Sequence, residues 1–290
     1  MSWLANLRTL LGNTDVRNEY LRWKGSKLLT GSPPSLPLPR GRRVFPAHRF
    51  NDYHSIARQR PDEAEFLLFK YLLGTGGGVF VDVGANVGAV SVLAASTGLV
   101  DRIVAFEPSH RYCSAWHMNT NANAIANATL IQAAVSDVTG EANFRADPAM
   151  PLHGRLDLGS LYATSRTMRV TTVTLDDACK LFGIRQIALL KIDVEGAEAK
   201  VIRGASKLLE KGRIDAIVLE FIVEHIEDMG DDPQAMVGEL VRAGFQIYEI
   251  LPGGEVGACL DHRNVVDSRR VPPGAKERPF WGINLVARKH

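Results

Sequence analysis

The sequence predicts an α/β protein in which helices cover both faces of a doubly wound, mostly parallel β-sheet. From residue 79 onward, short apolar runs alternate with helical segments, and several of the runs end in an acid or a glycine. Most of the runs are continuously apolar, which is typical of parallel strands buried on both faces. With 290 residues, the chain is long enough for one such domain and an appendage.

Seven segments have the length and apolar content of strands in this sheet. We expect them near residues 79–83, 102–107, 128–135, 187–193, 214–221, 245–250 and 281–287. Helices are expected between them, near residues 88–97, 109–124, 175–183, 196–210 and 233–243. Residues 141–173 interrupt the alternation, so we expect a hairpin and a loop at the side of the sheet.

We expect residues 1–75 to form an N-terminal helical and Pro-rich appendage, and residues 76–290 to form the main domain. Apolar residues at helical spacing open the chain, and a basic stretch follows them. Residues 31–39 are rich in proline and should be extended. A helix from Pro61 to Gly74 can cover the loop after the first strand. The appendage can dock on the core, join chains into a homo-oligomer, or bind a membrane surface or an anionic partner.

Residues 79–88 combine a buried strand with a tight loop of small residues. Gly84 allows a sharp turn, Asn86 tolerates left-handed backbone angles, and Gly88 begins an alanine-rich helix. Such a unit offers backbone N–H groups and a helix N-terminus to a polar cofactor. Asp82 would repel a pyrophosphate and attract a cation. This favours S-adenosylmethionine, which carries an ammonium and a sulfonium, over a dinucleotide.

A second acid, Glu107, ends the next strand, about 25 residues beyond Asp82, where doubly wound folds place an acid that hydrogen-bonds ribose hydroxyls. Ser136 and Asp137 follow the third strand and can meet the adenine, although Asp137 can instead be a turn residue before Gly140. The predicted cofactor-binding residues are Asp82, Gly84, Ala85, Asn86, Gly88, Glu107, Ser136 and Asp137.

In order and spacing, five segments resemble the FkbM family of S-adenosylmethionine-dependent methyltransferases, which belongs to the class I, Rossmann-like superfamily. They are residues 81–88 (VDVGANVG), 105–108 (AFEP), 134–140 (AVSDVTG), 174–177 (TLDD) and 190–198 (LKIDVEGAE). The resemblance implies methyl transfer, usually to a hydroxyl of a sugar or another small natural-product-like acceptor. It also implies that the last of the seven strands runs antiparallel.

Three residues near the ends of the fourth and fifth strands are candidates for catalysis. By the resemblance, Asp193 falls at the acceptor-facing position, where it can orient a hydroxyl or help take its proton. Glu195 can join it, because two close carboxylates raise the pKa of one, or can serve only as a favourable charge at a helix N-terminus. His225 can be a general base, since the pKa of imidazole suits that role, or an incidental polar residue.

The segment after the fourth strand also favours O-methylation. Amine methylation of bases uses an Asn/Asp-Pro-Pro-aromatic segment, and residues 192–195 offer no such platform. We assign no metal ligands, but an alternative is that Asp193, Glu220 and Asp231 hold a divalent cation that lowers the pKa of the hydroxyl.

Two other functions stay open. An NAD(P)-dependent oxidoreductase would usually lack Asp82 and keep a fuller glycine fingerprint. The chain has a Tyr-x-x-x-Lys pattern, Tyr20 to Lys24, but it precedes the cofactor loop and is misplaced for the active site of a short-chain reductase. A non-catalytic, cofactor-binding scaffold is the second alternative, and the carboxylates after the fourth strand weigh against it.

Composition limits the setting and the partners of the protein. A net charge of +2 does not favour nucleic acid, and three isolated cysteines are typical of reduced thiols. No apolar run approaches the roughly 20 residues of a membrane span, and no signal-peptide pattern opens the chain. We therefore expect a cytoplasmic enzyme that acts on a small-molecule or glycan acceptor.

Overall fold

The computed structural model describes residues 34–46, 60–146, 154–156, 166–270 and 284–289, together with residues 23, 24, 26, 28, 56 and 57. The expected helical start of the chain lies outside these residues, as do residues 281–283 of the last expected strand.

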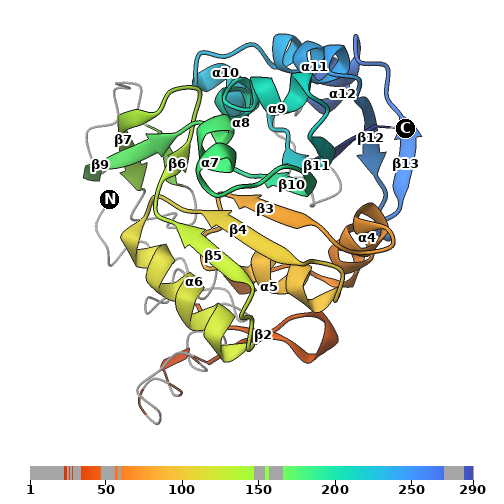
Figure 1. Ribbon diagram of the computed structural model, residues 1–290. Helices are drawn as coiled ribbons and strands as arrows, with labels where there is room; N and C mark the ends of the chain where they lie inside the picture. The colour runs from red at the N-terminus through yellow and green to blue at the C-terminus, as the bar shows by residue number, and fades with distance from the viewer. Residues whose placement is uncertain are drawn as a thin grey trace, which may run out of the picture.

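An eight-stranded sheet forms the centre of the fold, in the order β13-β12-β14-β11-β10-β3-β4-β5 (Figure 1). Its strands are β3 (Val79–Val83), β4 (Arg102–Phe106), β5 (Ala128–Ile131), β10 (Ile187–Ile192), β11 (Ile214–Glu220), β12 (Gln246–Ile250), β13 (Val256–Cys259) and β14 (Asn284–Arg288). The five strands from β5 to β11 are parallel, and β14 pairs antiparallel with β11. The expected parallel sheet and reversed last strand are therefore confirmed.

Two details of the sheet differ from the prediction of seven strands. An eighth strand, β13, pairs antiparallel with β12 at the edge. The third predicted strand, residues 128–135, is two strands, because the N–H of Ala133 donates to the carbonyl of Ile131 and turns the chain there. The second part, β6 (Ala134–Val135), belongs to another sheet.

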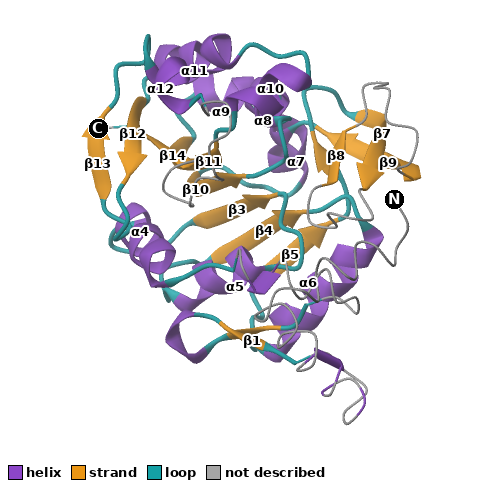
Figure 2. Cartoon of the chain, turned by 180° about the vertical axis from the view of Figure 1, so that it is seen from behind, coloured by secondary structure: helices purple, strands orange, loops and turns teal. Residues whose placement is uncertain are grey.

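Helices cover both faces of the central sheet, as the continuous apolar strands predict (Figures 1 and 2). On one face lie α4 (Glu63–Leu73), α5 (Ala89–Ser96) and α6 (His110–Ala122). On the other lie α7 (Leu175–Leu181), α8 (Glu198–Arg203), α9 (Ser206–Glu210), α10 (Val223–Asp228), α11 (Pro233–Arg242) and α12 (Val265–Arg269). Consecutive residues of β3 enter different cores: Phe80 packs with α4 and α5, and Val81 packs with the second group of helices.

The single helix predicted for residues 196–210 is interrupted between α8 and α9 at Gly204. A Cβ at Gly204 would overlap the backbone oxygen of Ser136, so the short residue lets the start of α9 approach the chain beyond β6. The predicted hairpin region forms the side sheet β6-β9-β7-β8, with β7 (Gly140–Ala146), β8 (Gly154–Leu156) and β9 (Arg166–Val173). Figure 2 shows β7, β8 and β9 beside the central sheet.

The described parts of the expected appendage pack closely on the rest of the chain. The strands β1 (Leu36–Pro37) and β2 (Arg43–Val44) pair antiparallel around the short helix η1 (Pro39–Gly41), and Val44 is buried against α5 and α6. Helix α4 begins with a capping box between Asp62 and Glu65 and shares a core with the central sheet. The boundary at residue 75 stays a prediction, but α4 and the sheet bury their side chains together. Among the described helices, none has the length and apolar character that crossing a membrane requires.

Candidate active site

The carboxyl ends of the parallel strands bring the predicted site residues to one edge of the sheet. Asp82 lies in β3, Glu107 follows β4, Asp193 follows β10, and Glu220 ends β11. Because β4, β3, β10 and β11 are consecutive neighbours, these four acids form a row along that edge. In open α/β sheets, ligands bind in the crevice at this edge.

Asp82 is fully buried, and its two carboxylate oxygens have different surroundings. Oδ2 accepts a hydrogen bond from Oγ of Ser91 at 2.6 Å, while Oδ1 is buried and has no hydrogen-bond partner among the described residues. Burial raises the pKa of Asp82, and the neighbouring Lys191 ammonium opposes this effect. A buried carboxylate oxygen without a donor is costly, so Oδ1 is suited to meet a donor or positive charge of a bound ligand.

Two residues that the sequence did not reveal orient Asp82. The indole Nε1 of Trp116 donates to Oγ of Ser91 at 3.0 Å, and Ser91 in turn donates to Asp82. Gly88 leaves room for the indole, because a Cβ there would lie 2.6 Å from Cδ1 of Trp116. The only hint in the sequence is that Ser91 interrupts the apolar start of α5.

The loop after β3 has the backbone that its small residues predict. Gly84 has a φ of 81°, and Asn86 has a φ of 50°. The N–H groups of Gly84 and Ala85 both donate to the carbonyl of Phe106, at 3.0 Å each. A Cβ at Gly84 would overlap the backbone oxygen of Asp193, so this glycine is where the loops after β3 and β10 touch.

Glu107 ties this loop to the end of β4. Its Oε2 accepts from the N–H of Asn86 at 3.0 Å, and its Oε1 accepts from the N–H of Ser109 at 2.8 Å. Burial raises the pKa of Glu107 to about 7, and these two hydrogen bonds act in the opposite direction. Each oxygen keeps a lone pair for a further donor, such as a ribose hydroxyl.

Asn119 of α6, which the sequence also did not reveal, holds the far side of the loop. Its amide nitrogen donates to the carbonyl of Val87 at 2.8 Å and to the carbonyl of Phe45 at 3.0 Å. Its oxygen accepts from the N–H of Phe45 at 2.6 Å. One fully buried side chain therefore connects the cofactor loop to the N-terminal segment.

Ser136 and Asp137 follow β6 and not a strand of the central sheet. Oγ of Ser136 donates to Oδ1 of Asp137 at 3.1 Å, and Arg203 donates to Oδ2 of Asp137 through Nε and Nη2, at 3.1 and 2.9 Å. Partial burial acts to raise the pKa of Asp137, but these hydrogen bonds outweigh it and hold the pKa below its usual value. The contact of Ser136 and Asp137 with adenine stays a prediction.

On the acceptor side, Asp193 pairs with a buried lysine. Lys191 Nζ donates to Oδ2 of Asp193 at 2.6 Å, and Lys191 is also in register with Asp82 across the β10–β3 pair. Burial acts to lower the pKa of Lys191, but the charges of Asp193 and Asp82 raise it above its usual value. Lys191 therefore stays an ammonium, and its hydrogen bond holds the side chain of Asp193 in place.

The structure brings Glu195 and His225 together, a pairing that the sequence did not indicate. Nδ1 of His225 lies 3.6 Å from Oε2 of Glu195, and a ligand atom of Glu220 lies within 4.8 Å of a ligand atom of each. Burial, followed by the charges of Asp193 and Glu195, raises the pKa of Glu220 well above its usual value.

The alternative cation set of Asp193, Glu220 and Asp231 is wrong with respect to Asp231. Its Oδ2 accepts from Lys200 Nζ at 3.1 Å, and its Oδ1 accepts from Arg203 Nη1 at 2.8 Å. Two cations therefore already compensate this carboxylate, and the group with metal-ligating geometry contains Glu195 and His225 instead.

Two further buried acids support the site. Glu198, in the first turn of α8, accepts from the N–H groups of Val194 and Gly196, at 3.1 and 3.2 Å, and burial raises its pKa to about 7. Glu198, and not Glu195, is thus the acid in the first turn of this helix. Glu65 of α4 is buried, and burial together with Asp62 raises its pKa to about 8.

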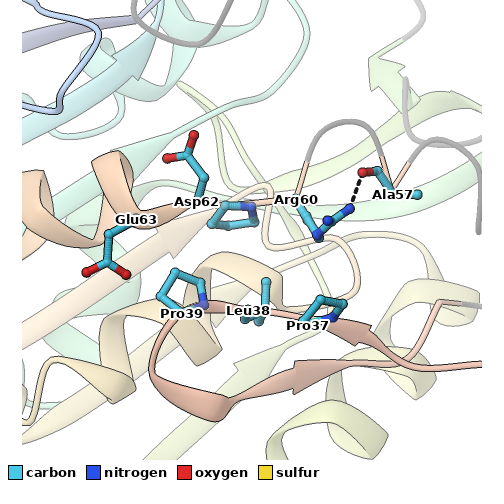
Figure 3. A pocket seen from close by; sticks show the side chains of 8 residues that line it. Pro37, Leu38, Pro39, Ala57, Arg60, Asp62 and Glu63 are labelled. Atoms are coloured by element: carbon cyan, nitrogen blue, oxygen red, sulfur yellow. Dashed lines mark hydrogen bonds between the residues drawn. The ribbon is translucent and has the colours of Figure 1, made fainter.

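A hollow of about 450 Å³ opens between the N-terminal hairpin and the start of α4 (Figure 3). Pro37, Leu38 and Pro39 line one side, and the segment from Arg60 to Glu63 lines the other. Arg60 donates to the carbonyl of Ala57 at its rim. None of the predicted site residues lines this hollow.

Comparison with known proteins defines the class of protein that this sheet and its row of acids form. The family model described as Methyltransferase FkbM domain matches residues 82–247, which is more than half of the chain. The chain belongs to the FkbM methyltransferase family, so the predicted resemblance is confirmed. FkbM methyltransferases use S-adenosylmethionine, which confirms the predicted cofactor.

Similar solved structures include the methyltransferase FkbM from Methylobacillus flagellatus KT, with 14% identity and a TM-score of 0.43 over 73% of this chain and 43% of that one. A putative methyltransferase from Streptococcus mutans, solved in complex with SAH, has 10% identity and a TM-score of 0.44 over 80% of this chain and 99% of that one. A ribosomal protein L11 methylase from Lactobacillus delbrueckii subsp. bulgaricus has 13% identity and a TM-score of 0.40 over 78% and 77%. The chain thus spans less than half the length of the first of these proteins. No curated protein sequence matches the chain.

Proposed function

We propose that this methyltransferase transfers a methyl group to a hydroxyl oxygen of a sugar or another small natural-product-like acceptor. The observation that supports the proposal most directly is the row of acids. Asp82, with its unpartnered Oδ1, lies between Glu107 on one neighbouring strand and Asp193 on the other. The first two acids face the cofactor in this proposal, and the third faces the acceptor.

The cofactor is assigned to the loop and the two acids beside it. Asp82 would compensate positive charge on the cofactor, and Glu107 would accept hydrogen bonds from its ribose hydroxyls. The backbone of Gly84, Ala85, Asn86 and Gly88 would line its path, with Ser136 and Asp137 near the adenine. When bound, S-adenosylmethionine supplies an electrophilic methyl group carried on a sulfonium.

The acceptor is assigned to the ends of β10 and β11. Lys191 donates to one oxygen of Asp193 and holds the side chain in place, so this carboxylate can accept a hydrogen bond from the acceptor hydroxyl and aim its oxygen. His225, with Nδ1 beside the Glu195 carboxylate, is the candidate to receive the hydroxyl proton. Because the sulfonium carbon is already reactive, alignment and exclusion of water supply most of the catalysis.

The charge of this edge supports a neutral acceptor. Asp193 and Glu195 lie close enough to Glu220 to repel its ionised form, and the buried cation Lys191 is already paired with Asp193. Such an acidic sheet edge repels the phosphates of a nucleic acid and accepts hydrogen bonds from the hydroxyl groups of a sugar.

The setting of the protein and its association remain proposals. Cys113, Cys179 and Cys259 are free thiols, which agrees with the reducing cytoplasm expected from the sequence. We also propose that the N-terminal segment can join chains into a homo-oligomer.

Calorimetric titration with S-adenosylmethionine, its demethylated product and NAD in parallel tests the cofactor assignment. We expect micromolar binding of the first two, lost in Asp82→Asn and weakened in Glu107→Gln. Asp101→Asn is the matched control, because Asp101 caps the opposite end of the sheet through the N–H of Gly78. Binding of NAD alone would overturn the proposal in favour of the oxidoreductase.

An acceptor screen follows, in which release of the demethylated cofactor is measured with sugars and glycosylated metabolites. We expect turnover with a hydroxyl acceptor that is lost in Asp193→Asn. Turnover that survives this substitution would refute the role of Asp193. Cofactor binding without turnover across the screen would favour the scaffold alternative.

A further inference from the structure

Three side chains from separate elements meet beside the proposed acceptor position. Glu195 comes from the loop after β10, Glu220 from the end of β11, and His225 from α10. One ligand atom of each lies within 4.8 Å of the others, which is the spacing of ligands around a single ion. Two carboxylates and one imidazole form a donor set that suits a divalent first-row transition metal.

His225 gives an independent sign that something belongs between these groups. Its Nδ1 is buried and has no hydrogen-bond partner among the described residues, although Oε2 of Glu195 lies only 3.6 Å away. Buried polar atoms are normally satisfied by protein or by a bound species. An unpartnered imidazole nitrogen 3.6 Å from a carboxylate oxygen, beyond ordinary hydrogen-bonding distance, is placed as a metal ligand would be.

The charge balance around Glu220 points the same way. Two of the three side chains in the group, Glu195 and Glu220, are carboxylates, and Asp193 and Glu198 are acids of the same segment as Glu195. Lys191 is moreover engaged by Asp193 at 2.6 Å. A divalent cation at the centre of the group would compensate the excess negative charge that the protein itself leaves there.

The local backbone holds the three groups in place. Glu195 has a φ of 56°, a left-handed conformation that is uncommon for a glutamate and is found where surrounding structure enforces it. Next to it, Gly196 has a φ of 102°, and a Cβ there would overlap the carbonyl of His225, so the loop and α10 touch directly. Glu198 fixes the same loop through two backbone N–H groups. This rigidity lowers the entropic cost of binding an ion.

We propose that Glu195, Glu220 and His225 bind a divalent metal ion, with Mn²⁺ as the ion that best fits two carboxylates and one imidazole. Three protein ligands leave open positions for oxygen atoms of a small molecule. Resting on the proposed function, the inference is that an acceptor with adjacent hydroxyls uses them, and that the ion lowers the pKa of the hydroxyl to be methylated. In that case Glu195 and His225 act through the ion, and Asp193 orients the hydroxyl and takes the proton that it loses as the oxygen bonds to the methyl carbon and the sulfonium leaves as a thioether.

The test is a titration of the purified protein with MnCl₂ in the absence of cofactor and acceptor, followed by the electron paramagnetic resonance signal of free Mn²⁺. We expect saturable binding of a single ion per chain. Glu195→Gln, Glu220→Gln and His225→Gln should each weaken it by about tenfold or more, since even the loss of an outer-shell partner costs that much. Glu224→Gln is the matched control, because it removes an acid next to His225 that is outside the group, and it should bind as the wild type does.

Circular dichroism establishes that each variant is folded before it is titrated. The isosteric Glu220→Gln is the decisive variant, because it removes a carboxylate from the group with little change in the shape of the side chain. In the wild type, Mn²⁺ should raise the thermal midpoint, and in Glu220→Gln it should not. Absence of saturable binding by the wild type, or equal binding by folded Glu220→Gln, would overturn the proposal.

Failure of this proposal is distinguishable from failure of the proposed function. Binding of S-adenosylmethionine without Mn²⁺ binding would overturn the metal site alone. Mn²⁺ binding that follows the three ligand variants, without S-adenosylmethionine binding, would support the metal site and overturn the assignment of the cofactor.

Discussion

Replacing Glu65 by glutamine should make the protein more stable, and the gain should grow with pH. Glu65 is buried, and its pKa rises from 4.5 to about 8, mainly through desolvation and secondarily through Asp62. Glutamine has nearly the same shape and can still accept the hydrogen bond from the N–H of Asp62 that completes the capping box. The substitution therefore removes an ionisation and little else.

The sign and size follow from proton linkage. Between pH 4.5 and about 8 the folded state keeps a proton on Glu65 that the unfolded chain has lost, so the contribution of Glu65 to wild-type stability falls as pH rises through this window. Because one pKa unit corresponds to about 1.4 kcal/mol, the full shift is worth up to about 5 kcal/mol once the carboxyl is ionised in both states. Below pH 4.5 this contribution is intact, and the wild type and Glu65→Gln should differ least.

Urea denaturation from about pH 4 to about pH 9 measures the effect as the difference in the free energy of unfolding between variant and wild type. Other buried acids titrate in both proteins, so their contributions largely cancel in this difference. Glu63→Gln is the control, because Glu63 lies on the same helix with a side chain that is 55% exposed and pairs with Arg40 at the surface. A difference for Glu65→Gln that does not change with pH would refute the assigned burial of this carboxyl.

Two other substitutions test the architecture of the cofactor loop. Gly84→Ala puts a methyl group against the backbone oxygen of Asp193 at a φ of 81°, so it should lower the free energy of unfolding by several kcal/mol and abolish S-adenosylmethionine binding. Gly98→Ala is the control: its φ is 69°, but nothing lies within 4 Å of the new methyl group, so it should lower the free energy of unfolding by only about 1–2 kcal/mol. Both are measured by urea denaturation and calorimetry, and equal losses would refute the close approach of the two loops. Ser91→Ala removes the donor to the Asp82 carboxylate and the acceptor of the buried indole, and should cost about 2–4 kcal/mol and weaken cofactor binding. If Ser91→Ala changes neither the free energy of unfolding nor cofactor binding, measured by the same two methods, the assigned role of the hydrogen bonds from Trp116 to Ser91 and from Ser91 to Asp82 is wrong.

The pattern of apolar residues along the chain was sufficient to predict the parallel strands of the central sheet. The run Val79–Val83 was predicted with its observed bounds, because a continuous β-branched stretch followed by a left-handed glycine leaves few alternatives. The break after Ile131 was not predictable, because it depends on one local hydrogen bond that diverts the chain to a second sheet. Strand β13 contains Gly257 and is only four residues long, so it has little apolar signal of its own.

The site was predictable where chemistry depends on strand ends and not where it depends on contacts in space. Asp82 and Glu107 lie next to recognisable turns, so the sequence indicated both. Lys191 and Glu65 are buried ionisable residues, against the ordinary tendency of their residue types, and only the folded structure shows their surroundings. That Arg203 and Lys200 compensate Asp231 is likewise a matter of helix packing, which no spacing along the chain reveals.

Asn119 couples the stability of the N-terminal segment to the stability of the loop after β3, because it makes hydrogen bonds to both. The same amide group hydrogen-bonds the backbone of Phe45 and the backbone of Val87, so a shift of either segment disturbs the hydrogen bonds that Asn119 makes to both. A molecule that binds to and orders the loop around Val87 should also order the N-terminal segment. By reciprocity, anchoring that segment should strengthen the binding of the molecule by the same free energy. A shortened chain that starts after residue 46 would leave a buried amide without two of its three partners. We therefore expect the segment around Phe45 to contribute to cofactor affinity through Asn119.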